Sequence, residues 1–160
     1  MKSIKVNGSP RDKGLAHGEK FKKDIKELTA IRKFLLKSYV KQERMPELEE
    51  SCLLQVERLK KHPELYDEFI GISEAADLSV TDLAILNNYT DIRDFFQSGG
   101  DHDGKFEGGC SLYSFRRDQK QSCGQTWDMH ASATPYVLHI EDELADGRKL
   151  NILTLTGCLG

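Results

Sequence analysis

A cysteine that follows two glycines is the residue best placed to do chemistry in this 160-residue chain. Cys110 comes directly after Gly108 and Gly109, and it opens the strand-like run 111–115. Glycine adopts backbone angles closed to other residues, so a thiol here can attack a strained carbonyl on its N-terminal side. The peptide bond would become a thioester, and water would then release a new N-terminus. The order of residues therefore predicts self-cleavage between Gly109 and Cys110.

After such a cleavage Cys110 would carry two reactive groups, a thiol and a free α-amino group. An α-amino group titrates at about 7.7–8.0 in reference peptides. It can therefore serve as the general base for the thiol of the same residue. The predicted role of Cys110 is that of a nucleophile.

An aspartate lies on the next strand-like run, 125–129, after a polar segment of hairpin length. If the hairpin turns about Gln119 without a bulge, Asp128 falls opposite Cys110 and their Cβ atoms lie about 5 Å apart. We therefore expect Asp128 to orient the α-amino group and to hold it in the useful protonation state. The alternative is an ordinary strand-end aspartate that bonds to a turn.

The neighbours of Asp128 are candidates for an acyl-binding pocket. They are Trp127, Met129 and His130. Trp127 is equally well explained as a core residue.

Three motifs together resemble the isopenicillin N acyltransferase family of N-terminal-nucleophile (Ntn) hydrolases. They are Gly-Cys-Ser at 109–111, Gly-Gln-Thr-Trp-Asp at 124–128, and Gly-Leu-Ala-His-Gly at 14–18. The resemblance covers the chain from about Asn7 onward. It implies self-cleavage before Cys110 into small and large subunits from one precursor, and amide hydrolysis or acyl transfer through a cysteine thioester.

The family also implies an α+β fold in which two stacked antiparallel sheets lie between helical layers, an αββα sandwich. Residues 1–109 would be a helical pro-segment or small subunit with a flexible linker at 97–109. Residues 110–160 would be the start of the catalytic β-sandwich. The family supplies an oxyanion-hole asparagine and an arginine from further downstream, so we expect the chain to be incomplete at its C-terminus. No cofactor is implied, although a coenzyme A thioester could be the acyl donor to a small-molecule amide or acyl substrate.

Composition narrows the class of protein. With 31% charged residues and a net charge of −3, the chain lacks the basic surface of a nucleic-acid-binding protein. It shows neither a signal-like start nor an apolar run of membrane-spanning length, so we expect a soluble cytoplasmic protein with no membrane partner.

The metal-ligating residue types do not form a convincing site. None of the four cysteines is part of a Cys-x-x-Cys pair, which argues against structural zinc. Asp101, His102 and Asp103 could ligate a metal, but adjacent loop side chains rarely do so unaided. We predict no metal site, and we expect Cys52 to be a core residue on an apolar helix face.

Apolar periodicity predicts four helices followed by four strands, an α+β order. The helices cover about 12–40, 45–62, 65–77 and 79–96, and the strands 111–115, 125–129, 136–141 and 149–156, with a loop at 131–135. Cys110, Leu112 and Leu153 are expected in sheet interiors, and Lys22, Glu50 and Lys60 at the surface. His17 is either a family marker near the cleavage point or a packing or capping histidine, and we favour the second.

The alternative function is a non-catalytic, mainly helical interaction protein whose exposed strands pair with another polypeptide. A plain thiol protease with a separate histidine base is a weaker explanation, because no histidine shares a recognisable motif with Cys110.

Overall fold

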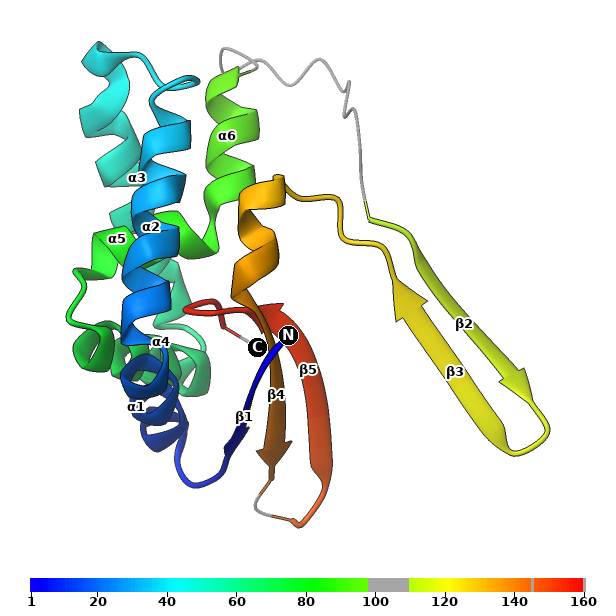
Figure 1. Cartoon of the computed structure of the whole chain (residues 1–160). Helices are drawn as coiled ribbons and strands as arrows, with labels where there is room; N and C mark the ends of the chain where they lie inside the picture. Colours follow the sequence, from blue (N-terminus) through cyan, green and yellow to red (C-terminus); the bar gives the residue numbers. More distant parts are fainter. Residues whose placement is uncertain (98–109, 145, 160) are drawn as a thin grey trace.

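The chain forms a group of helices beside a three-stranded sheet, and a two-stranded hairpin stands apart from both (Figure 1). This computed structural model describes residues 1–97, 110–144 and 146–159. The α+β class expected from the sequence is confirmed. None of the helices in the described ranges is both long and apolar enough to cross a membrane.

The three-stranded sheet joins the two ends of the chain. Its order is β1 (Lys2–Val6), β4 (Val137–Glu143), β5 (Lys149–Leu155). β1 runs parallel to β4, and β4 runs antiparallel to β5. β4 and β5 confirm the last two predicted strands.

β1 is a strand that the sequence prediction omits. Ile4 and Val6 are buried while Ser3 and Lys5 are exposed, and this alternation is the signal of a half-buried strand. The strand is short, and its partner β4 lies at the opposite end of the sequence. Only the folded chain brings the two together.

The helices begin close to the predicted positions. Their bounds are α1 Pro10–Lys20, α2 Lys22–Leu36, α3 Met45–Leu59, α4 Pro63–Ala76, α5 Val80–Asn87 and α6 Tyr89–Gln97, with short 3-10 helices η1 Gln42–Arg44 and η2 Ala131–Tyr136. Ser9 and Ser79 cap α1 and α5 through their side chains, and Asp77 ends α4 in the left-handed conformation. η2 replaces the loop that was expected at 131–135.

Two of the predicted helices are each divided in two, which corrects the prediction. The backbone leaves the helical conformation at Phe21 (φ −116°, ψ 20°) and at Asn88 (φ −111°, ψ 19°). Phe21 is buried and its ring meets the His17 ring edge to face, so the break at Phe21 serves packing. An apolar stripe cannot reveal such a break, because the helical period continues on both sides of it.

Helices α1 and α4 cross so closely that glycine is required at the contact. A Cβ added to Gly14 would overlap the carbonyl oxygen of Glu68, and one added to Gly71 would lie 2.6 Å from the carbonyl oxygen of Arg11. The first glycine of the 14–18 motif therefore has a packing role in this fold.

One hydrophobic core contains residues from both predicted segments of the chain, 1–109 and 110–160. Ile25, Leu28 and Leu83 from the helices are fully buried together with Leu138 from β4. Cys52 belongs to this core, as expected. Lys22, Glu50 and Lys60 are exposed, which confirms their prediction.

The expected burial of the strand residues is wrong. Cys110 is exposed, and the exposed fractions of Leu112 and Leu153 are 76% and 56%. Leu112 lies on the separate hairpin and Leu153 on the outer face of β5. No second layer of the described residues covers these surfaces, so their apolar side chains face solvent.

Candidate active site

Cys110 lies two residues before the first strand of a β-hairpin. The hairpin consists of β2 (Leu112–Arg117) and β3 (Lys120–Gln125), and all of its residues are exposed except Gly124, which is half-buried. The thiol of Cys110 is free and exposed, so a substrate could reach it. Gly108 and Gly109, on which the predicted cleavage depends, lie outside the described residues.

Two hydrogen bonds tie the residue after Cys110 to the strand that leads to Asp128. The Ser111 N–H donates to Thr126 Oγ1 at 2.8 Å, and the Thr126 N–H donates to the Ser111 carbonyl at 2.9 Å. This tie fixes the end of the hairpin that carries Cys110. It also places Asp128 only two residues beyond the paired position.

The predicted register of Cys110 and Asp128 is wrong by one residue. Leu112 pairs with Gln125, and the loop is the two-residue turn Asp118-Gln119, with Asp118 at φ 55°. Continuing this register places Trp127 opposite Cys110. Cys110 and residues 126–130 lie outside the two strands, so the ladder itself does not set the direction of the Asp128 side chain.

The two-residue turn also changes the bounds of both strands from those predicted. β2 and β3 extend through most of the polar segment that was expected to be the connection, and β3 ends before Thr126. Aspartate tolerates a positive φ, so the turn is tighter than the polar composition suggests.

The three candidate pocket residues have different surroundings in the structure. Trp127 is 38% exposed, Met129 packs against the hydrophobic core, and His130 caps η2 by accepting from the Ser132 N–H at Nδ1. They follow one another along the segment between β3 and η2. Their role in an acyl pocket stays a prediction.

Cys52 and Cys158 differ from Cys110 because burial makes their thiols less acidic. Burial raises the pKa of Cys52 to about 11 and that of Cys158 to about 12, where the nearby Arg32 opposes the shift. A thiol with such a pKa stays protonated and unreactive at neutral pH. Cys123 is exposed on β3 opposite Ser114, so Cys110 and Cys123 are the two accessible thiols in the described residues.

The best-organised polar contact lies elsewhere, where α1 meets the segment after β5. His17 is 1% exposed, and its Nε2 accepts a hydrogen bond from the Gly157 N–H at 2.9 Å. Gly157 has φ 86°, and a Cβ there would lie 2.6 Å from Leu86 Cδ2, so only glycine fits. This confirms the packing interpretation of His17, whose partner the sequence does not indicate.

A buried arginine also escaped the sequence analysis. The Arg32 side chain is 1% exposed, and its guanidinium carbon lies 4.1 Å from the centre of the Tyr89 ring. None of its guanidinium nitrogens has a hydrogen-bond partner in good geometry among the described residues, and the Tyr89 hydroxyl only partly opposes the lowering of the Arg32 pKa by burial. An arginine within an apolar helix stripe is the signal that could have identified it.

Metal binding receives no support from the described residues. They contain no group of three or more His, Cys, Asp or Glu side chains arranged to hold an ion. Asp101, His102 and Asp103 lie outside the described residues.

Comparison with known proteins adds no family assignment. No family model matches the chain, and no curated protein sequence matches it.

Proposed function

We propose that this chain is a cysteine Ntn-type amidohydrolase or acyltransferase that cleaves C–N amide bonds through a thioester on Cys110. The observation that carries the proposal is the Ser111–Thr126 tie, which holds an exposed Cys110 at the start of a strand beside the segment that ends in Asp128. Because the hydrogen bonds are made by Ser111, cleavage before Cys110 would leave the new α-amino group of Cys110 free while Ser111 keeps the residue in place.

Activation would begin with attack of the Cys110 thiol on the Gly109 carbonyl carbon. The C–N bond breaks, the nitrogen keeps its own hydrogen and takes the thiol proton to become the α-amino group, and the acyl group moves to sulfur. Water then hydrolyses the thioester, which gives a carboxylate on Gly109 and restores the thiol. The products would be the small and large subunits of one precursor.

Turnover would repeat this chemistry on a small-molecule amide. The α-amino group accepts the thiol proton, the thiolate attacks the substrate carbonyl, and the leaving amine takes the proton. The acyl-enzyme then reacts with water in hydrolysis or with an amine in acyl transfer. A coenzyme A thioester could supply the acyl group in the second case.

Asp128 would act as a positioning residue for the α-amino group. Continuing the β2–β3 register brings Trp127 opposite Cys110 in place of Asp128, so the role requires a local shift of 127–130. These residues lie beyond the β2–β3 ladder, and none of them belongs to a strand. Such a shift would therefore break no ladder hydrogen bond.

The proposed fold would be the αββα sandwich, with the antiparallel β2–β3 hairpin and the antiparallel β4–β5 pair as parts of its two sheets; the parallel β1 differs from the expected antiparallel pattern. The stacked rings of Tyr113 and Phe115 on the hairpin, 57% exposed each, support it. Leu153 on the outer face of β5 is a second apolar side chain that no layer of the described residues covers.

The test is the intact mass of the protein expressed from its complete gene. We expect a cut before Cys110 without added protease, and only uncut protein from Cys110→Ala. Cys123→Ala is the matched control, because it removes the other accessible thiol of the same hairpin and should still be cut. Equal cleavage of the wild type and Cys110→Ala would exclude Cys110 from the mechanism.

The alternative function is the non-catalytic interaction protein, which the exposed apolar side chains of the hairpin favour. A single uncut wild-type species that forms no thioester with an acyl donor would support it. The two functions are therefore separated by the same protein sample.

A further inference from the structure

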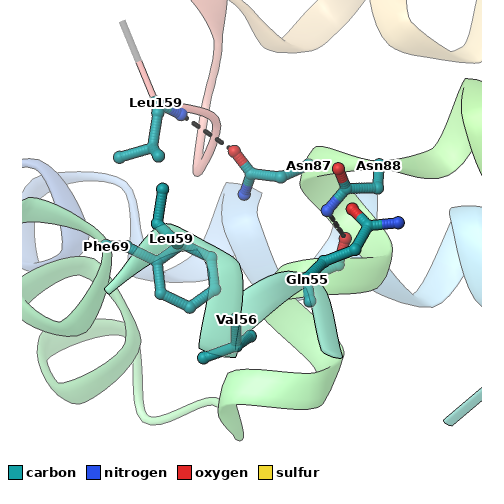
Figure 2. A pocket seen from close by; sticks show the side chains of 8 residues that line it. Gln55, Val56, Leu59, Phe69, Asn87, Asn88 and Leu159 are labelled. Atoms are coloured by element: carbon teal, nitrogen blue, oxygen red, sulfur yellow. Dashed lines mark hydrogen bonds between the residues drawn. The ribbon is translucent and has the colours of Figure 1, made fainter. Parts of the chain in front are cut away.

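A pocket in the helical part of the chain lies away from Cys110. Its volume is about 200 Å³, and it opens between α3, α4, α5 and the segment that follows β5 (Figure 2). The lining residues are Gln55, Val56, Leu59, Phe69, Ala84, Asn87, Asn88 and Leu159. They include no charged side chain.

One wall of the pocket is fixed by Asn87. Its Oδ1 accepts from the Leu159 N–H at 3.0 Å, and its Nδ2 donates to the carbonyls of Gly157 and Leu83 at 2.9 Å each. Asn87 therefore uses both polar atoms of its side chain to hold the segment that carries Leu159. The pocket is formed without a ligand.

The walls divide into an apolar side and a polar side. Leu59 and Phe69 lie on one side of the view, and the carboxamides of Gln55 and Asn88 lie on the other (Figure 2). Asn88 Nδ2 donates to the Ala84 carbonyl at 2.9 Å. Among the described residues, the Asn88 Oδ1 and both polar atoms of Gln55 have no hydrogen-bond partner, so this side offers a donor and two acceptors.

We propose that this pocket binds a small neutral amide. A charged group would lose its hydration without meeting an opposite charge, which is costly. A carboxamide, in contrast, can donate and accept at once, as Gln55 and Asn88 require. A cavity of roughly 150 Å³ holds benzene, so this one suits a ligand with an aromatic or short aliphatic body against Phe69.

The site does not depend on the proposed catalytic function, since none of its lining residues belongs to the hairpin. Its test uses the whole 160-residue chain and two probes of one shape, benzamide and benzoate. Binding is followed by NMR chemical-shift titration and calorimetry. We expect saturable shifts at Val56 and Ala84 with benzamide, and binding of benzoate at least about tenfold weaker.

Two variants assign the site. Gln55→Leu replaces one carboxamide with an apolar side chain, so benzamide should bind about fivefold more weakly, the effect of one neutral hydrogen bond. Gln42→Leu, on the exposed η1, is the matched control and should bind as the wild type does. Equal affinity for the two probes, unchanged benzamide binding in Gln55→Leu, or no saturable binding would each overturn the proposal.

Discussion

The stability of this protein should depend on pH through one buried histidine. The Nε2 of His17 accepts the Gly157 N–H, and a ring nitrogen that accepts a hydrogen bond carries no proton. Burial lowers the pKa of His17 from 6.5 to about 4. The folded protein therefore keeps this ring neutral at pH values where the unfolded chain protonates it.

The sign follows from proton binding. Between pH 6.5 and about 4 the unfolded state binds one more proton than the folded state at this site, so stability falls as the pH falls. The contribution is fully present above pH 6.5, and its loss is complete below the folded-state pKa. At about 1.4 kcal/mol per pH unit, the loss across this window is roughly 3 kcal/mol.

The assay is urea unfolding at pH 7.0 and pH 4.5 for the wild type and His17→Gln. Glutamine can accept the same hydrogen bond but does not titrate in this range. Whatever the substitution costs at pH 7.0, the difference in free energy of unfolding between the two proteins should shrink by about 2–3 kcal/mol at pH 4.5.

The matched control is His62→Gln, because His62 is exposed at the start of α4 and its side chain makes no capping bond. This variant should follow the pH dependence of the wild type. If His17→Gln also loses stability between the two pH values as fast as the wild type does, protonation of His17 is not the cause and the reasoning is wrong.

Three further substitutions test the packing and the buried charges. Gly14→Ala should cost about 1–3 kcal/mol, because a Cβ overlaps the Glu68 carbonyl, and a melting temperature equal to that of the wild type would contradict the close α1–α4 contact. Lys13 Nζ lies 2.7 Å from Asp142 Oδ1 in a half-buried ion pair, and Lys13→Met leaves that carboxylate without its cation. Urea unfolding should show a loss of stability of about 2–3 kcal/mol. No loss would mean that water solvates the Asp142 carboxylate as well as the lysine does. Arg32→Met removes a buried guanidinium that has no hydrogen bond in good geometry to a described residue, so the free energy of unfolding should stay equal or rise by about 1–2 kcal/mol. A large loss of stability would show that the contact with Tyr89 outweighs desolvation.

Local signals were enough to predict much of the helical part. Ser79, Pro63 and Asp77 mark helix ends through capping, a fixed φ or a left-handed conformation, and each acts within a few residues of its own position. The turn between β4 and β5 also has a local signal, because Gly147 adopts φ 80°, a conformation that glycine favours. Such features can be read from neighbouring residues.

The candidate site is harder, because its geometry depends on register. Cys110, Asp128 and the hairpin between them were evident as residue types and spacing. Their register depends on whether the turn has two residues or three, and that difference decides whether Trp127 or Asp128 falls opposite Cys110. The tight turn requires a positive φ at Asp118, and the polar composition of the segment does not specify which residue adopts it.

Contacts between distant parts of the chain were decided by the tertiary structure alone. The residue types of His17 and Gly157 do not reveal that they pair, and nothing within β1 identifies β4 as its partner. The sequence by itself determined which segments are helical and which thiol follows two glycines. The fold decided which polar groups meet, because a buried hydrogen bond forms only where packing brings its donor and acceptor within about 3 Å.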